Sequence, residues 1–293
     1  MPRSAHKTQP ARTSAGTSSH PWVELPSLLN HDGAIFHGFT TKKPFTRKGK
    51  VVHFNFREPP EGDGKIFRQS LTELAKESGV SQSRIIYPQQ EHGAEVLTIM
   101  QENPPSDFET LRQVRADAVV TDIPGLLIGV RTADCVPILL YDERAGIVAA
   151  VHAGWRGTVA GVLERTLEIL FKQFHSEPAT LHAAVGPSVS FESFEVDEQV
   201  LARFRERFAF WSRFARPTRG NKWFIDLKMI NAYILAAAGI SEKALDVSPH
   251  CTVQDKALFY SYRREGDGAG RMLNFIGLRG KPGLDKRKGL SVK

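Results

Sequence analysis

The chain has 293 residues, of which 41% are apolar and 24% are charged, and its formal net charge is +7. This composition provides enough apolar surface for a sizeable core and excludes a chain that is disordered throughout. Two cysteines exclude a disulfide scaffold and a four-cysteine zinc finger, and no apolar run approaches the roughly 18 residues that span a membrane.

The basic charge is concentrated at the two ends of the chain. Residues 1–23 carry +3 and residues 279–293 carry +5, which leaves −1 for residues 24–278. Because nucleic-acid enzymes usually carry their basic side chains on a folded face, we do not expect nucleic acid as the partner.

Both ends are predicted to be tails of one domain. Residues 1–21 have no apolar period and no apolar segment of a secretory signal, which predicts a disordered basic tail on a cytoplasmic protein. Residues 281–293 are predicted to form a second basic tail. Residues 22–280 contain no strong Pro/Gly linker and are predicted to form a single domain.

Helix and strand signals alternate along this domain. In chain order we predict a helix over 65–78, a strand over 96–100, a strand–turn–strand over 118–130, strands over 136–141 and 147–152, a helix over 158–174, a strand over 181–185, helices over 197–214 and 227–238, and strands over 259–262 and 272–276. Several strands follow one another without a helix between them. The pattern therefore predicts an α+β fold with mixed β-sheets flanked by helices, rather than a doubly wound parallel sheet.

Three metal-ligating residue types occur at ends of predicted strands, where loops gather. His92 and Cys135 each precede a strand, and His152 ends one. Two imidazoles and one thiolate suit Zn²⁺, and three protein ligands leave a fourth position open, as in catalytic sites. Each residue alone has a simpler interpretation, because a single Cys is often a small buried hydrophobe and a strand-end His a satisfied polar group.

The segment Gly154-Trp155-Arg156-Gly157 joins a predicted strand to a predicted helix. Backbone N–H groups at such a turn favour an anion such as phosphate, and Arg156 could add a fork of donors. A tight turn that places Trp155 in the core explains the same residues equally well.

Four motifs occur together and in order: Gln90-Glu91-His92-Gly93, Ala133-Asp134-Cys135-Val136-Pro137, His152-Ala153-Gly154-Trp155-Arg156-Gly157, and Ser261-Tyr262-Arg263-Arg264 followed by Gly270-Arg271-Met272. From about Phe36 to Leu278 the chain resembles the bacterial laccase-domain family, also called the YfiH-like or multicopper polyphenol oxidase family. The resemblance implies a single YfiH-like α+β domain with a catalytic zinc site at His92, Cys135 and His152. It also implies phosphorolysis of adenosine, inosine, guanosine and S-methyl-5′-thioadenosine, with phosphate as the second substrate, and deamination of adenosine.

The resemblance further implies which residues contact substrate. Asn55 and Arg68 map to the pocket, with Arg68 also in a catalytic role, and Gly154 and Arg156 are expected at the phosphate. The chain departs from the family pattern without losing a metal ligand, at three positions: Glu91 in place of Val, Phe194 in place of Tyr and Phe67 in place of Asn.

Other functions stay open at this point. Cys135 could be the nucleophile of a hydrolase that edits peptidoglycan precursors, with His152 or His92 as its base. A copper-dependent polyphenol oxidase is disfavoured, because none of the ten histidines forms the His-x-His pairs of a multicopper centre, although adventitious Cu²⁺ could occupy the predicted zinc site. We further expect Asp134 to support the Cys135 ligand, Glu91 to face solvent and Cys251 to be structural. The sequence leaves the preferred nucleoside and the oligomeric state undetermined.

Overall fold

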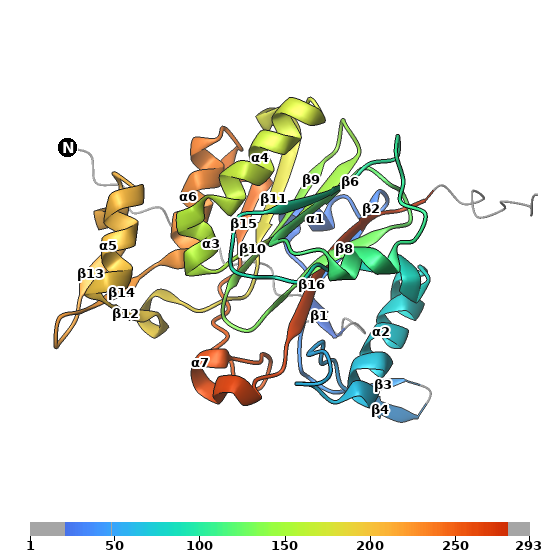
Figure 1. Cartoon of the computed structure of the whole chain (residues 1–293), viewed down its shortest axis with the longest axis horizontal. Coiled ribbons are helices and arrows are strands. Elements are labelled where there is room, and N and C mark those ends of the chain that lie inside the picture. The colour runs from blue at the N-terminus through green and yellow to red at the C-terminus, as the bar shows by residue number, and fades with distance from the viewer. Residues whose placement is uncertain (1–20, 48, 281–293) are drawn as a thin grey trace, which may run out of the picture.

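The protein is described by a computed structural model that covers residues 21–47 and 49–280 (Figure 1). The predicted basic tails, residue 21 apart, lie outside the described residues. None of the described helices is long and apolar enough to cross a membrane.

Two mixed sheets form the centre of the molecule. In spatial order, the five-stranded sheet consists of β1 (Trp22–Val23), β2 (Ile35–Thr40), β16 (Met272–Leu278), β8 (Leu127–Thr132) and β5 (Ile85–Ile86). The six-stranded sheet consists of β15 (Leu245–Val247), β11 (Leu181–Val185), β9 (Val136–Asp142), β10 (Ile147–Ala153), β7 (Ala118–Thr121) and β6 (Val96–Ile99). The smaller sheets are β12 (Glu195–Asp197), β14 (Lys222–Ile225) and β13 (Ala215–Pro217), and the hairpin of β3 (Phe45–Arg47) and β4 (Lys50–Val52).

Helices lie on the outer sides of these sheets. The α-helices are α1 (Pro26–Leu29), α2 (Gly64–Ser78), α3 (Trp155–Ala160), α4 (Val162–Gln173), α5 (Glu198–Arg207), α6 (Leu227–Ala237) and α7 (Tyr262–Glu265). Short 3₁₀ helices cover Gln82–Arg84, Glu109–Gln113, Pro178–Thr180, Phe191–Ser193, Trp211–Arg213, Glu242–Ala244 and Gly266–Gly268. In Figure 1, α4 and α6 lie on one side of the molecule and α2 on the other, while α5 and β12–β14 project at the margin.

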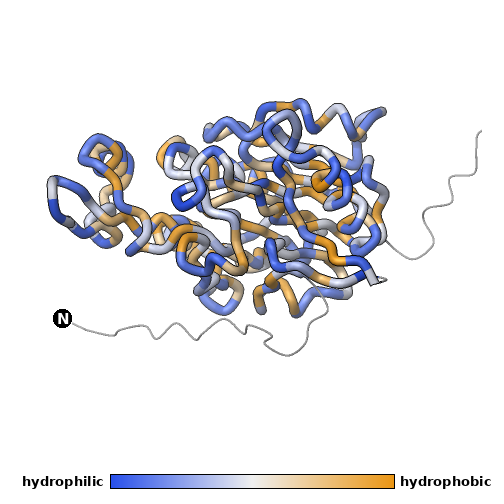
Figure 2. Tube along the Cα trace, turned by 90° about the horizontal axis from the view of Figure 1, so that it is seen from below, coloured by the Kyte–Doolittle hydropathy of each residue, from blue (hydrophilic) through white to orange (hydrophobic). Residues whose placement is uncertain are grey.

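Three apolar clusters lie between these layers. Along β10, Ala149 and Val151 enter the cluster that also contains residues of α4 and α6, whereas Val148 and Ala150 enter the cluster shared by the two large sheets. This alternation is the period of two of a β-strand, and burial on both faces explains why the central strands are apolar throughout. The third cluster packs α2 against the other face of the five-stranded sheet. The hydropathy view shows apolar segments running through the inside of the body and polar loops at its edge (Figure 2).

The predicted α+β class is confirmed, and most predicted strands are present. The predicted helix over 158–174 is two helices, α3 and α4, because the chain turns at Gly161, where φ is +85°. The helix predicted over 197–214 ends at Arg207. Beyond it, Phe208, Phe210 and Phe214 form a run of ring contacts instead of continuing the helix.

The strand predicted over 259–262 was wrong. Ser261 instead caps the start of α7, where its hydroxyl accepts a hydrogen bond from the backbone N–H of Arg264. A serine in this position satisfies an otherwise unpaired donor of the first helical turn, which favours a helix start over a strand. The strands β1–β4 and the small sheet β12–β14 were not predicted at all.

Candidate metal centre

The structure brings His92, Cys135 and His152 together. Cys135 Sγ lies 3.8 Å from His92 Nε2, and the two imidazole rings are nearly perpendicular, with centroids 4.8 Å apart. One ligand atom from each of the three residues lies within 4.8 Å of the others. His152 is buried, Cys135 is half-buried and His92 is exposed, so the cluster is closed on one side and open to solvent on the other.

Strand register explains why these residues meet. In the antiparallel pair β9–β10, Pro137 faces His152 and Val136 faces Ala153. Cys135, which directly precedes β9, is therefore placed beside the end of β10. His92 lies in the loop before β6, at the edge of the same sheet.

Asp117 orients two of the three ligands. Its Oδ1 lies 2.7 Å from His152 Nδ1, and both side chains are buried. The same carboxylate accepts hydrogen bonds from the backbone N–H groups of Glu91, His92 and Gly93, at 3.2, 2.9 and 2.7 Å. The bond to His152 keeps the Nδ1 proton in place and leaves the Nε2 lone pair for a metal.

Sequence reasoning missed Asp117, although a signal was present. The residue stands directly before Ala118–Thr121, which is buried throughout. A carboxylate at that position is costly to bury unless partners satisfy it, so it indicated a buried polar network.

The turns that carry two ligands have unusual backbone geometry. His92 and Asp134 have φ values of +61° and +93°, in the left-handed region that residues with a Cβ rarely adopt. Asp134 accepts hydrogen bonds from Thr252 Oγ1 (2.6 Å), Ser261 Oγ (3.0 Å) and the backbone N–H of Arg263 (2.6 Å). Asp134 therefore holds the turn before Cys135 in place through these three partners.

The electrostatics of the cluster favour a thiolate. Burial alone would raise the pKa of the Cys135 thiol, but the charge of His152 and hydrogen bonds from His152 and His92 lower it to about 6. Burial would lower the pKa of His152, yet Cys135 and Asp117 raise it to about 9. A deprotonated thiol is the form that binds a metal and also the form that acts as a nucleophile.

Position 154 has no room for a side chain. Its φ is −66°, which any residue adopts, but a Cβ there would lie 3.0 Å from both Cys135 Sγ and His92 Cδ2. The six-residue helix α3 follows, with Trp155 packed at the edge of the main core and the exposed Arg156 stacked on the Trp155 ring at 4.4 Å. The tight-turn interpretation of this motif is thus the one that the contacts favour.

We expect Gly154→Ala to weaken metal binding about tenfold or more, because the added methyl group pushes two ligand side chains apart. Competition with a chromogenic zinc chelator measures this affinity. Gly33→Ala is the matched control, since nothing lies within 4 Å of a Cβ at Gly33. Equal zinc affinity in both variants would contradict the steric argument.

Arg271 lies where the charges of Arg57, Arg131 and Cys135 all act on it. Burial, and then the charges of Arg57 and Arg131, lower the pKa of Arg271, whereas Cys135 raises it. Arg131 forms an ion pair with Glu58, while the Arg57 guanidinium has no hydrogen bond or ion pair within residues 21–47 and 49–280.

The predicted substrate residues lie in different surroundings. Asn55 Oδ1 accepts hydrogen bonds from the backbone N–H groups of Arg57 (3.1 Å) and Arg271 (3.0 Å), so it ties two of the arginine segments together. Arg68 is exposed on α2, and its guanidinium lies near Gly64 at the start of that helix. No contact in the described part of the chain joins Arg68 to the metal ligands.

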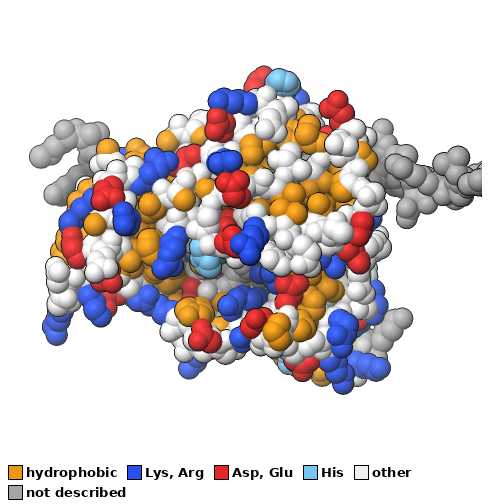
Figure 3. Space-filling view, viewed as in Figure 1, with side chains coloured by type: hydrophobic (Ala, Val, Ile, Leu, Met, Phe, Trp, Pro, Cys, Tyr) orange, Lys and Arg blue, Asp and Glu red, His pale blue; other side chains and the backbone are white. Residues whose placement is uncertain are grey.

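The surface around the cluster is hollowed and charged. In the space-filling view, Lys, Arg, Asp and Glu side chains surround a hollow between α3 and α7 (Figure 3). The helix α3 begins beside Gly154, and α7 begins at the residues that hold Asp134. The hollow therefore lies beside the metal-ligand cluster.

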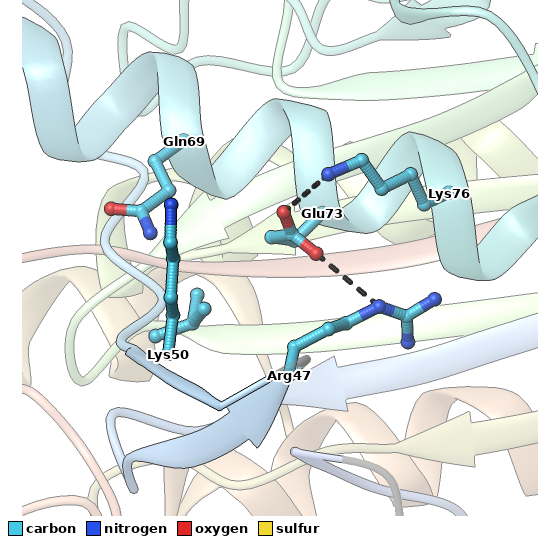
Figure 4. A pocket seen from close by; sticks show the side chains of 6 residues that line it. Arg47, Lys50, Gln69, Glu73 and Lys76 are labelled. Atoms are coloured by element: carbon cyan, nitrogen blue, oxygen red, sulfur yellow. Dashed lines mark hydrogen bonds and ion pairs between the residues drawn. The ribbon is translucent and has the colours of Figure 1, made fainter.

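A separate groove of about 640 Å³ lies between the β3–β4 hairpin and α2 (Figure 4). Its lining residues are Arg47, Lys50, Val52, Gln69, Glu73 and Lys76. Glu73 pairs with Lys76 at 2.6 Å and with Arg47 at 3.5 Å, and Arg47 also pairs with Glu77, so these charges already have partners. None of the candidate metal ligands lines this groove, so it is separate from the cluster at Cys135.

Comparison with known proteins places the chain in a family. Residues 36–279 match the model of the multi-copper polyphenol oxidoreductase laccase family. The chain belongs to this family. This laccase-like chain is 34% identical to a purine nucleoside phosphorylase of Deinococcus radiodurans over 260 residues. The aligned residues make up 88% of this chain and 95% of the relative.

Two further matches agree with this placement. The protein named adenosine deaminase RL5, from an unknown prokaryotic organism, is 36% identical over 206 residues, which are 69% of this laccase-like chain and 78% of RL5. The crystal structure of YlmD from Geobacillus stearothermophilus superposes with a TM-score of 0.79 at 29% identity, and covers 90% of this chain and 98% of YlmD. The single-domain fold is thus that of the YlmD and YfiH structures.

Proposed function

We propose that this protein is a zinc-dependent purine nucleoside phosphorylase of the cytoplasm. It would cleave adenosine, inosine, guanosine and S-methyl-5′-thioadenosine with phosphate, release the base and (methylthio)ribose 1-phosphate, and also deaminate adenosine. Relatives named purine nucleoside phosphorylase and adenosine deaminase support this proposal. The observation that carries it is the open His92–Cys135–His152 cluster next to an arginine group.

The donor set fits zinc. Two imidazoles and a thiolate are ligands that Zn²⁺ prefers, and a buried carboxylate on one imidazole is a common support of zinc sites. His92, Cys135 and His152 would hold the ion and leave one position open. A bound Zn²⁺ would supply a Lewis acid at that position.

The protein's own groups have a defined task in phosphorolysis. A phosphate oxygen forms a bond to C1′ of the ribose, the bond from C1′ to the purine nitrogen breaks, and the purine leaves with a proton. The phosphate must be held beneath C1′, which requires cationic donors aimed at its oxygens. We propose Arg57 and Arg271 for this role, with Asn55 fixing their backbone, and Arg68, Gly154 and Arg156 as further substrate contacts.

Replacing Arg57 with alanine is expected to raise the KM for phosphate about tenfold or more, since a charge-assisted hydrogen bond contributes about 1.5–3 kcal/mol. Zinc content should be unchanged, because Arg57 is not a ligand. Initial rates at varied phosphate measure the effect in Arg57→Ala, in Arg68→Ala and in Arg203→Ala, an exposed control. If the KM for phosphate rises only in Arg68→Ala, the phosphate site lies at α2 and not at Arg57.

One assay tests the proposed function. Purified protein with quantified metal is incubated with adenosine, first with phosphate and then without it, and adenine, inosine and ribose 1-phosphate are followed. We expect adenine and ribose 1-phosphate only with phosphate, and inosine in both conditions. Stoichiometric zinc with no turnover of any purine nucleoside would overturn the substrate assignment.

A cysteine hydrolase acting on peptidoglycan precursors is the second candidate. One observation favours it: the side chains of Cys135, His152 and Asp117 are arranged like the nucleophile, base and orienting carboxylate of a catalytic triad. A thiol nucleophile keeps its activity in a chelator and loses it to an alkylating reagent. Chelator-resistant hydrolysis of a precursor amide would favour this candidate over the zinc enzyme.

A further inference from the structure

We propose that the protein binds a second divalent metal ion, of the Zn²⁺ type, at His31, Glu143 and His182. The Glu143 carboxylate lies 3.8 Å from His31 Nδ1 and 3.7 Å from His182 Nε2, and the two imidazole rings have centroids 4.1 Å apart. One ligand atom from each of the three residues lies within 4.8 Å of the others.

Three separate segments supply these side chains. His182 is on β11 and faces Tyr141 of β9 in the antiparallel register. Glu143 directly follows β9, and its backbone N–H donates to the carbonyl of Thr180. His31 lies in the turn after α1, where its backbone N–H donates to Leu28. The backbone of each segment is therefore held independently of the cluster.

The three side chains are spaced more widely than hydrogen-bonded partners and slightly more widely than the ligands of a bound ion. Distances of 3.7 and 3.8 Å between nitrogen and oxygen exceed the ~3.2 Å limit of an ordinary N–H···O bond. Ligand atoms around a tetrahedral zinc, with bonds of about 2.0–2.1 Å, lie about 3.3 Å apart. Approaches of about half an ångström would bring the Glu143 carboxylate to that spacing from each imidazole nitrogen.

Exposure and charge agree with an ion at this place. Each imidazole is 19% exposed and the Glu143 carboxylate is 49% exposed, so water can deliver an ion and fill its remaining positions. Arg144 does not neutralise Glu143, because its guanidinium pairs with Glu177 at 2.8 Å.

Charged groups of both signs act on the residues around the cluster. Burial, Glu143 and then Asp142 raise the pKa of Tyr141, whose ring packs against His31. The nearby buried His37 has no hydrogen-bond partner for either ring nitrogen, and burial, Arg279 and His31 lower its pKa to about 4. Arg279 donates to the carbonyls of Asp32 and Ile35, so its guanidinium is held by the backbone.

The proposed ion is distinct from the one at Cys135. Cys135 directly precedes β9 and Glu143 directly follows it, and the eight residue steps between them span about 26 Å along the strand. An ion at His31 would therefore connect the turn after α1 to the ends of β9 and β11, which is a stabilising role. The absence of a thiolate among these ligands makes the two sites distinguishable by spectroscopy.

Metal titration of the full chain tests the proposal. Dialysis with Zn²⁺ and metal analysis should give two ions per chain in the wild type and one in His31→Ala, His182→Ala and Glu143→Gln. Exposed His53 provides the control, and His53→Ala should keep two ions. One ion in the wild type, or two ions in all three site variants, would overturn the proposal.

Cobalt separates this site from the candidate active site. With Co²⁺, the near-ultraviolet band of a thiolate ligand should persist in His182→Ala and disappear in Cys135→Ala. The Cys135→Ala protein should still bind one ion and gain thermal stability from it, since ligands that bind only the folded state stabilise it. If that gain is equally large after His182→Ala is added, the ion is held elsewhere and the proposal fails. Neither readout depends on turnover of nucleosides.

Discussion

Cys135→Ala is expected to lower kcat/KM for phosphorolysis of adenosine by about 10³-fold or more and to remove the tightly bound zinc. The variant leaves two imidazoles, one of them exposed, with no thiolate to complete the site. A catalytic metal contributes several kcal/mol of transition-state stabilisation, and each 1.36 kcal/mol is a factor of about ten in rate. Deamination should fall with phosphorolysis, because both reactions are assigned to the same ion.

The other cysteine provides the matched control for this experiment. Cys251 is buried, accepts a hydrogen bond from the backbone N–H of Ser190 and lies near Ser193 Oγ, away from the candidate metal ligands. Cys251→Ala should keep zinc and activity. Full phosphorolysis by Cys135→Ala would contradict the assignment of the active site. A thiol nucleophile would be indicated instead if the wild type stays active in a strong chelator and Cys135→Ala is inactive.

The sequence predicts the central strands well because burial on both faces leaves a strong apolar signal. The strands β7 to β11 each carry such a run, and their ends are marked by Gly, Pro or charged residues. The very short strands β1 and β5 have two residues each, so they have no period to detect. Their pairing partners lie far along the chain, and tertiary contacts decide whether such segments become strands.

The three candidate metal ligands could be found from the sequence because each stands close to the end of a recognisable strand. The arginine group was not, since Arg57, Arg131 and Arg271 come from three segments that only the folded chain brings together. Arg156, which follows the glycine-rich turn, stacks its guanidinium on the Trp155 ring. Residue types at strand ends can thus be predicted locally, whereas the cationic part of the site depends on long-range pairing.

The carboxylates that support the cluster also depend on contacts between distant segments. Asp134 attracted attention because it adjoins Cys135, yet its contacts are to Thr252, Ser261 and Arg263, more than a hundred residues away. Asp117 is far from every ligand in the sequence and contacts two of the ligand segments. Support for a metal site is therefore better predicted from buried charge than from proximity in the sequence.

Asp117→Asn is expected to weaken zinc binding about 10–100-fold, the usual cost of losing a group that orients metal ligands. The carboxylate accepts four donors, which are His152 Nδ1 and three backbone N–H groups. An amide has a single acceptor oxygen and two N–H donors of its own. The amide nitrogen of the asparagine would therefore face N–H groups that donate to the carboxylate in the wild type. His152 would then lose its fixed tautomer, or the turn at His92, with its φ of +61°, would lose its anchor.

Acid titration separates this role from simple filling of space. Burial raises the pKa of Asp117, but the hydrogen bond and charge of His152 and the backbone donors outweigh it and hold the pKa below its ordinary 3.8. The stability that Asp117 contributes is therefore present above that ordinary value and is lost as the pH falls through the lower, folded-state pKa. The melting temperature of the wild type should exceed that of Asp117→Asn at neutral pH, and the difference should shrink in acid. Asp122→Asn is the control, since Asp122 caps the backbone N–H of Gln101 and contacts no ligand. A variant that melts earlier but binds zinc as tightly as the wild type would show that Asp117 supports the fold and not the metal.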